Sequence, residues 1–121
     1  METIHKIRIG GHLFAQPQDL LKLEARENYT QIYFRSGKEV LVATTIGLLE
    51  ERLTDHGFYR TDRGAVVNMS CVKSLYRNGR KMRVRLNNND LMKVSKRRIN
   101  DMLNLSIQRD IDLIDNHTFT Y

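Results

Sequence analysis

The sequence predicts a mainly β fold with two short helices, at about residues 45–56 and 96–105. β-Branched and aromatic residues gather in short runs separated by Gly, Asn and Asp, a pattern typical of strands joined by tight turns. An Asn-Gly pair lies between two of these runs, which is a strong hairpin signal. Apolar residues recur at helical spacing in two places, so we expect helices there and strands elsewhere.

The first part of the chain is expected to form short strands joined by turns. Gly10-Gly11 marks a bend, and the segment 26–30 reads as a polar loop before a strand rich in β-branched and aromatic residues. Ser36-Gly37-Lys38 then turns the chain into a hairpin partner. The strands are expected over residues 4–14 (as one or two), 20–25, 31–35 and 39–43.

The first helix is predicted over residues 45–56. Ile46, Leu49 and Leu53 are spaced i, i+3 and i+7, which places them on one apolar stripe. A threonine hydroxyl at the start can accept a hydrogen bond from an orphan backbone N–H. Gly57 suits the left-handed conformation in which helices commonly end.

The second half of the chain is expected to contain the clearest hairpin. Asn78-Gly79 predicts a type I′ turn, because both residues tolerate positive φ angles. In the segment 81–86, Met, Val and Leu alternate with Lys and Arg, which predicts a strand with an apolar inner face and a basic outer face. Strands are expected over residues 65–67, 72–77, 81–86 and 91–94.

The second helix is expected to begin after Ser95, whose hydroxyl can cap it. Ile99, Met102 and Leu103 form its apolar stripe, at spacing 0, 3 and 4. The same face can run on as a dimer seam, or dock on the sheet of its own domain. The residues of this extended stripe are Ile107, Ile111 and Ile114.

Three cations, Lys96, Arg97 and Arg98, crowd the first turn of this helix. Positive charge there opposes the helix macrodipole, at a cost of a few tenths of a kcal/mol for each residue. Either the fold tolerates this cost, or a nearby anion compensates it. We interpret the cluster as evidence for an anion.

Positive charge is concentrated in one part of the chain. The chain carries a net charge of +6, but residues 60–98 hold 12 basic and 2 acidic residues, a charge of +10. The remainder holds 8 basic and 12 acidic residues, a charge of −4. Such a block indicates a polyanionic partner, with the solvated face of a basic domain as the alternative. Charge alone does not distinguish DNA from RNA or an anionic membrane surface.

The signatures of several other protein classes are missing from the sequence. Cys71 is the single cysteine, so no internal disulfide forms, and we expect it to be buried as a small apolar residue. The four histidines lie apart from metal-ligand spacings, and no Gly-rich phosphate loop occurs. We therefore expect no catalytic residue, no metal and no cofactor. No apolar run is long enough to span a membrane and no signal pattern occurs, which favours a cytoplasmic location.

Four short motifs together resemble the LytTR domain, the DNA-binding output module of many bacterial response regulators. Residues 24–30, Glu-Ala-Arg-Glu-Asn-Tyr-Thr, resemble its E-A-x-x-N-Y-T signature. Residues 48–53 match its L-x-x-L-E-x-x-L helix with a slight shift. The segments 58–60 and 66–68, Phe-Tyr-Arg and Val-Val-Asn, match its most specific block, F-x-R-x-H-R-S-x-x-V-N. Residues 94–97 resemble its closing V-S-R element.

The resemblance covers roughly Ile7 to Leu105 and implies an elongated fold of small antiparallel β-sheets with short helices. It divides the chain into a domain over residues 1–105 and a C-terminal extension over residues 106–121, helical or frayed. It implies transcriptional regulation through double-stranded DNA, by loops that enter successive major grooves of direct-repeat sites. A homodimer on DNA and an upstream receiver or sensor domain, absent from this chain, are the other expected partners.

Carried over by position, the resemblance assigns base contacts to Thr30, Arg63 and Arg97. Their charge suits five basic residues to contacts with the DNA phosphates: Arg60, Lys73, Lys93, Lys96 and Arg98. Asn28 is also expected to contact the DNA backbone. Two departures stand beside Arg63: Asp62 replaces the usual His, and Gly64 replaces the frequent Ser. They support the alternative function, a protein-interaction or RNA-binding β module that has kept the LytTR pattern.

Overall fold

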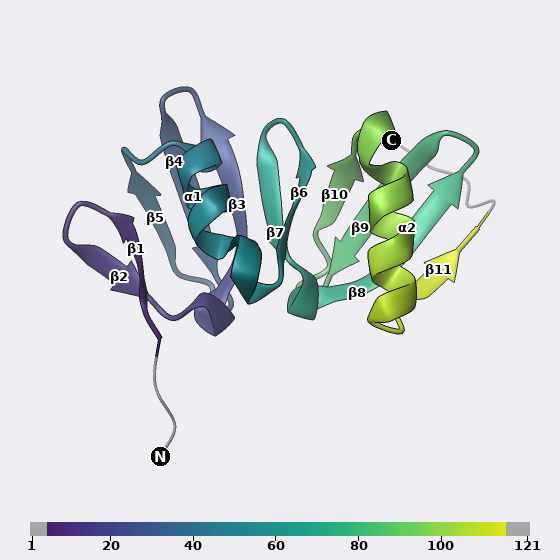
Figure 1. The fold of residues 1–121 in the computed structure, drawn as a ribbon, viewed down its shortest axis with the longest axis horizontal. Coiled ribbons are helices and arrows are strands. Elements are labelled where there is room, and N and C mark those ends of the chain that lie inside the picture. The colour runs from purple at the N-terminus through teal and green to yellow at the C-terminus, as the bar shows by residue number, and fades with distance from the viewer. Residues whose placement is uncertain (1–4, 116–121) are drawn as a thin grey trace, which may run out of the picture. The chain divides into compact units, whose positions relative to one another are not determined.

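The computed structural model describes residues 5–115, which form small β-sheets, two α-helices and short 3-10 turns (Figure 1). This confirms the predicted mainly β fold. The chain divides into two compact units. The first unit comprises the residues up to Arg60 together with Gly64–Ser70. The second unit comprises Thr61–Arg63 and the residues from Cys71 onward.

The first unit contains a five-stranded sheet of order β5-β4-β3-β7-β6 and a separate β1-β2 hairpin. The expected polar loop over residues 26–30 is wrong, because Arg26 pairs with Tyr29 and the turn between β3 and β4 holds just two residues. The strands are β1 (Ile7–Gly10), β2 (Leu13–Ala15), β3 (Leu20–Arg26), β4 (Tyr29–Phe34), β5 (Glu39–Val42), β6 (Phe58–Asp62) and β7 (Ala65–Asn68). Residue 4, which the sequence placed in the first strand, lies outside the described residues.

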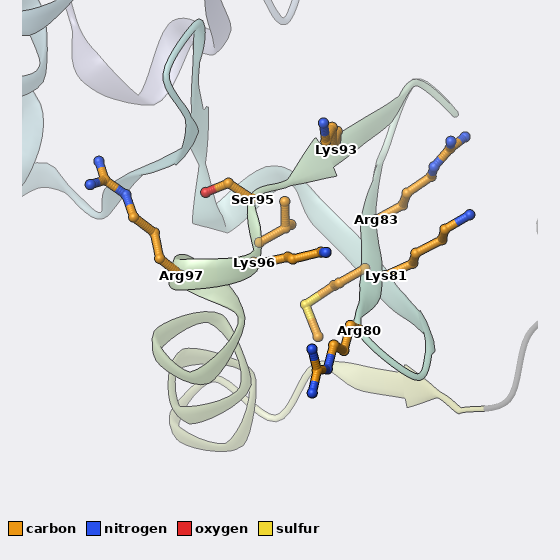
Figure 2. A pocket seen from close by; sticks show the side chains of 9 residues that line it. Arg80, Lys81, Arg83, Lys93, Ser95, Lys96 and Arg97 are labelled. Atoms are coloured by element: carbon orange, nitrogen blue, oxygen red, sulfur yellow. The ribbon is translucent and has the colours of Figure 1, made fainter.

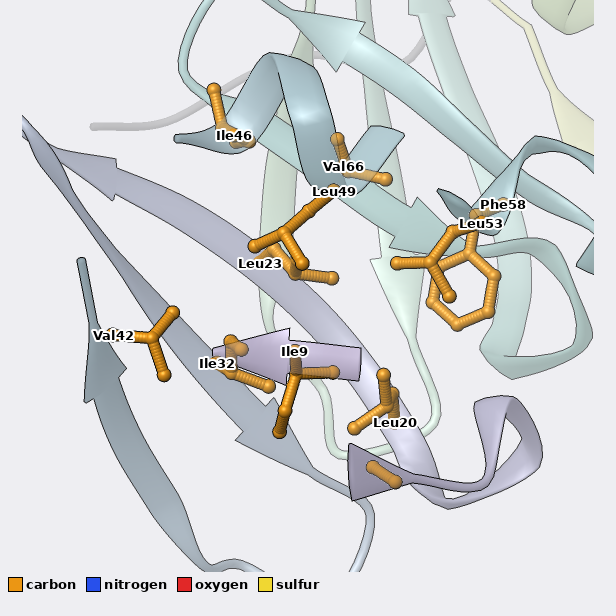
Figure 3. Packing of buried hydrophobic residues seen from close by; sticks show 11 residues of the cluster. Ile9, Leu20, Leu23, Ile32, Val42, Ile46, Leu49, Leu53, Phe58 and Val66 are labelled. Carbon is orange, nitrogen blue, oxygen red and sulfur yellow. The ribbon is translucent and has the colours of Figure 1, made fainter. Parts of the chain in front are cut away.

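Helix α1 (Ile46–Leu53) covers one face of this sheet and closes the first core. The Thr45 hydroxyl accepts a hydrogen bond from the Leu48 N–H, and a 3-10 turn (Thr54–His56) leads to Gly57 at φ 80°. Figure 3 shows Leu49 and Leu53 of α1 among side chains of the sheet, and both leucines are fully buried. Burial of each such leucine contributes about 1.5–3 kcal/mol. The predicted helix, its cap and its apolar stripe are all confirmed.

The second unit contains a four-stranded sheet of order β10-β9-β8-β11, with helix α2 (Ile99–Gln108) lying across it (Figure 1). The strands are β8 (Val72–Asn78), β9 (Lys81–Leu86), β10 (Leu91–Val94) and β11 (Asp112–Ile114). Alternate residues of β9 are buried, as predicted, and Met102 of α2 is fully buried with them. Cys71 is also fully buried, as predicted.

The β8–β9 hairpin differs from the predicted type I′ turn. Asn78 pairs with Lys81, so Gly79 and Arg80 form the turn. Of Asn78 and Gly79, only the glycine has a positive φ, of 60°, whereas a type I′ turn on that pair needs both. The predicted turn would have placed Arg77 opposite Arg80, and like charges that face each other across a ladder are destabilising.

The second helix also begins differently from the prediction. Residues Lys96–Arg98 form a 3-10 turn before α2, and the Arg98 N–H donates to the Ser95 carbonyl at 2.9 Å. The Ser95 hydroxyl makes no capping bond, so the predicted side-chain cap is wrong. The three cations therefore occupy a 3-10 turn that precedes the α-helix.

The expected continuation of the apolar stripe beyond α2 is wrong as well. Asp110 adopts a left-handed φ of 56°, and the Ile111 N–H donates back to the Ser106 carbonyl at 2.8 Å. This geometry is a Schellman motif, which ends a helix. Ile107 is 78% exposed, and Ile114 lies in β11, which pairs in parallel with β8. Residues 116–121, with His117, lie outside the described part of the chain.

Candidate nucleic-acid interface

A basic groove with a volume of about 710 Å³ lies in the second unit (Figure 2). It is formed by the β8–β9 turn, the adjoining halves of β9 and β10, and the 3-10 turn before α2. Six of its nine lining residues are basic: Arg80, Lys81, Arg83, Lys93, Lys96 and Arg97. The others are Met82, Val94 and Ser95. We call this site the basic groove.

Strand geometry explains why cations gather there. Successive side chains of a strand point to opposite faces, so burial of Met82 leaves Lys81 and Arg83 on the other face of β9. The register of the sheet then places Lys93 of β10 directly opposite Arg83. Two like charges in that arrangement repel each other. The site therefore holds a local electrostatic cost that an anion would relieve.

The structure brings the segments of two predicted base-reading residues together. The Ser95 N–H donates to the Thr61 carbonyl at 2.9 Å, which joins the start of the 3-10 turn to the end of β6. Arg97 and Arg63 each lie two residues beyond this hydrogen bond, and both are exposed. Figure 2 shows Arg97 pointing away from the β8–β9 hairpin, whereas Lys96 points toward it. Lys96 and Arg97, although adjacent in sequence, thus point to different sides of the 3-10 turn.

Buried hydroxyls lie at the same junction. The Oγ1 of Thr61 and the Oγ of Ser95 are buried and find no hydrogen-bond partner within residues 5–115. A buried polar group without a partner costs about 1–3 kcal/mol. The base of the Arg63 and Arg97 segments therefore holds unused hydrogen-bonding capacity.

Thr30 does not fit its predicted role as a base-contacting residue. Its side chain is fully buried, and its hydroxyl donates to the Thr44 carbonyl at 2.7 Å. The neighbouring residues of the β3–β4 turn are the exposed ones: Asn28, and Tyr29 at 50% exposure. The residue before them, Glu27, adopts a positive φ of 57°, which is strained for a residue with a side chain.

Arg60 does not fit a free phosphate-binding role either. Its side chain is 16% exposed, and its guanidinium pairs with the Glu50 carboxylate at 2.9 Å, which ties β6 to α1. Among the other predicted backbone contacts, Lys73, Lys93 and Lys96 are exposed and Arg98 is half-buried. Lys73 and Arg98 are not among the residues that line the groove.

A polar network supports the strands that carry the β3–β4 turn. The Glu24 carboxylate accepts hydrogen bonds from Lys22 at 3.0 Å, from Arg26 at 2.8 Å and from the Tyr33 hydroxyl at 3.0 Å. The Lys22 ammonium also lies 4.4 Å from the centre of the Tyr33 ring. Burial opposes ionisation of Glu24, but the hydrogen bonds from Arg26 and Lys22 outweigh it and lower its pKa. Burial and the bond to Glu24 raise the pKa of Tyr33.

The sequence had not assigned Arg80, Lys81 and Arg83 to the site, although all three line the groove. The alternation of basic residues along β9 was visible, but it indicated only a basic outer face. Two features of the sequence could have identified these residues. Arg80 and Lys81 are consecutive cations at the predicted hairpin turn, and the strand that follows alternates apolar with basic residues. Their proximity to Lys96 depends on how β10 pairs with β9.

A comparison with protein-family sequence models matches residues 11–106 to the LytTr DNA-binding domain. The chain belongs to the LytTR family of DNA-binding domains. The match covers the basic groove and the β3–β4 turn, so both lie within the LytTR domain. Strand β11 lies beyond it.

A solved structure supports the same fold. The LytTr DNA-binding domain of a response regulator from Bacillus cereus superposes with a TM-score of 0.69 at 17% sequence identity. The similarity covers 87% of this LytTR chain and 97% of that chain. The search of curated proteins found no match.

Two further observations concern the described residues of the LytTR chain. Within residues 5–115, no group of three or more His, Cys, Asp and Glu residues is placed to hold a metal ion. No helix in the same range is long and apolar enough to cross a membrane.

Proposed function

We propose that this LytTR domain binds double-stranded DNA in a sequence-specific manner, as part of a bacterial transcriptional regulator. In this proposal, loops enter successive major grooves of a direct-repeat site, and Arg63 and Arg97 contact bases. An arginine can donate two hydrogen bonds to the O6 and N7 edge of guanine. The observation that supports this most directly is the Ser95–Thr61 hydrogen bond, which holds both arginine segments together beside the basic groove.

Contacts with the DNA backbone are proposed for one polar residue of the first unit and four basic residues of the second. Phosphate contacts position a protein on the duplex without specifying sequence. Asn28 takes this role in the β3–β4 turn, where it is exposed whereas Thr30 is buried. The remaining backbone contacts are proposed for Lys73, Lys93, Lys96 and Arg98. Arg60 is proposed to position β6 through Glu50 instead.

The proposed assembly has further parts. Two copies would occupy the two halves of a direct-repeat site as a homodimer on DNA, and an upstream receiver or sensor domain would supply the input signal. The domain boundary is proposed near residues 105–106, with the C-terminal segment as an extension. A cytoplasmic location is also proposed, which the low cysteine content of the chain fits.

The decisive experiment is a selection on random double-stranded DNA, followed by binding measurements on the selected duplex. We expect one enriched motif, present as a direct repeat. The Arg63→Ala variant should lose about 1–3 kcal/mol of binding free energy on this duplex and accept more bases at one position. The matched control is Arg35→Ala, which removes an exposed arginine from the first unit.

Two outcomes would contradict the proposal. A selection that enriches no motif would favour the protein-interaction or RNA-binding alternative, to which Asp62 and Gly64 pointed. If instead a motif is enriched but Arg63→Ala and Arg97→Ala bind it as tightly as the parent does, DNA binding stands and the assignment of these arginines fails.

A further inference from the structure

We propose that the basic groove binds the sugar–phosphate backbone of one DNA strand, and that Arg80 and Lys81 of the β8–β9 hairpin are additional backbone-binding residues. This inference rests on the proposed function, and it extends the DNA contact beyond the loops that the sequence indicated. The groove would contribute to the DNA-binding free energy by an amount that depends on the salt concentration but not on the DNA sequence.

The charge of the groove is the first argument. Its six cations come from the hairpin, β10 and the 3-10 turn, three segments that are separated in sequence and brought together by pairing. In the part of the chain that the structure describes, no acidic residue is among the nine that line the groove. A solvated basic face commonly interleaves both signs of charge. A concave site of one sign concentrates counter-ions instead.

The free side chains of the groove are the second argument. Within residues 5–115, the side chains of Arg80, Lys93, Lys96 and Arg97 make no hydrogen bond or ion pair. Arg85, the next basic residue on the same face of β9, is different because it lies outside the groove and has partners in its own unit. Its guanidinium donates to the Tyr76 hydroxyl at 3.0 Å and to the Asn89 carbonyl at 3.3 Å. Four of the six groove cations therefore make no hydrogen bond or ion pair within residues 5–115.

The shape of the groove is the third argument. Its volume of about 710 Å³ falls in the range of ligand-binding sites. Met82 and Val94 are among its lining residues but are almost fully buried, so the aliphatic stems of its lysines and arginines supply the apolar surface beside the positive charge. A DNA backbone alternates phosphates with less polar sugars, which matches this lining better than an isolated small anion does. Arg97 also lines the groove, but Figure 2 shows it pointing away from the hairpin, so we assign base reading to Arg97 and backbone binding to the other five groove cations.

The test compares two double variants that remove the same charge from different units. In R80A/K81A the hairpin loses two groove cations, whereas R35A/K38A loses two exposed cations of the first unit. Binding to the selected duplex and to a scrambled duplex is measured over a range of salt concentrations. Release of counter-ions gives a slope of about −0.9 in log K against log salt for each phosphate neutralised.

We expect R80A/K81A to make this slope shallower by about 1–2. Its loss of affinity should be equal on both duplexes, so the preference for the selected duplex stays unchanged. R35A/K38A should keep the slope of the parent. If R80A/K81A keeps the parental slope and affinity, or if it weakens only the selected duplex, the groove does not bind the backbone as inferred.

The design separates this inference from the proposed function. A parent chain that binds no duplex overturns the proposed function, whereas a parental slope in R80A/K81A overturns only the role of the groove. Circular dichroism during thermal unfolding checks that the hairpin variant folds. If its unfolding differs from that of the parent, R80Q/K81Q supplies the same test, because glutamine keeps the length of the side chains and removes their charge.

Discussion

The two units share one architecture, a β-sheet covered by a helix, but they differ in net charge. Residues 1–60 and 64–70 hold eight basic and eight acidic residues, so the first unit has no net charge. Residues 61–63 and 71–121 hold twelve basic and six acidic residues, so the entire net charge of +6 belongs to the second unit.

The partners of the charged residues differ in the same way. In the first unit, Glu24 joins Lys22 and Arg26, and Glu50 joins Arg60. In the second unit, four cations of the basic groove make no hydrogen bond or ion pair within residues 5–115. The second unit also has an internal ion pair, between Arg77 and Asp115 at 2.6 Å. The comparison teaches that both units use charges to hold their own fold together, while the second unit also keeps four cations available for a partner.

Removal of a core side chain from the first unit should have the largest effect. Leu49 of α1 is fully buried in the core cluster, so Leu49→Ala should lower the free energy of unfolding by about 2–5 kcal/mol. Urea unfolding followed by circular dichroism measures the loss. The matched control is Leu48→Ala in the same helix, where the side chain is 41% exposed and the effect should be small. Equal losses in both variants would contradict the assignment of this core.

Loss of the Glu24 carboxylate should have the next largest effect. Glu24→Gln should lower the free energy of unfolding at neutral pH by about 1–2 kcal/mol, because it leaves the nearly buried Lys22 ammonium without its anion. The exposed Glu51→Gln is the control. The salt dependence of DNA binding should stay parental in both variants, because the network lies outside the groove.

The pH dependence of the same variant tests the lowered pKa of Glu24. A carboxylate whose pKa is lower in the folded state contributes stability above its unfolded value, 4.5, and loses it as the pH falls through the folded value. The difference in unfolding free energy between parent and Glu24→Gln should therefore shrink as the pH falls below about 4.5. A difference that stays constant or grows on acidification would contradict the network.

The strained β3–β4 turn should become more stable when its backbone is relaxed. Glu27 holds a φ of 57°, where glycine has no side-chain penalty, so Glu27→Gly should raise the free energy of unfolding by about 1 kcal/mol. Glu27→Ala is the control, because it removes the same charge but keeps the strain. Equal thermal unfolding temperatures for the two variants would rule out backbone strain as the cause.

The smallest change in stability is expected when the like-charged pair of Lys93 and Arg83 loses one of its charges. Lys93→Gln removes the charge opposite Arg83 and should raise the free energy of unfolding by about 0.2–1 kcal/mol. The same variant should weaken DNA binding. Lys73→Gln, whose side chain is exposed on β8, should leave the stability unchanged. A loss of stability in Lys93→Gln would mean that this lysine supports the fold.

Local sequence determined most of the elements and the family. The stripe of Ile46, Leu49 and Leu53 located α1, because an apolar face at helical spacing needs a core. Alternation along residues 81–86 assigned the two faces of β9, because side chains of a strand alternate strictly. These signals depend only on neighbours along the chain, so they can be recognised without knowing the fold.

The tertiary structure decided which of the candidate residues are accessible and which lie together. Thr30 and Arg60 each looked like a surface residue, but one donates to the Thr44 carbonyl and the other pairs with Glu50. No pattern in the sequence shows that these partners are near, because each contact spans ten or more residues. The register of β9 against β10 likewise placed Arg83 beside Lys93 and so created the basic groove. The sequence by itself determined that this is a basic LytTR domain, whereas long-range pairing decided which of its cations face a partner.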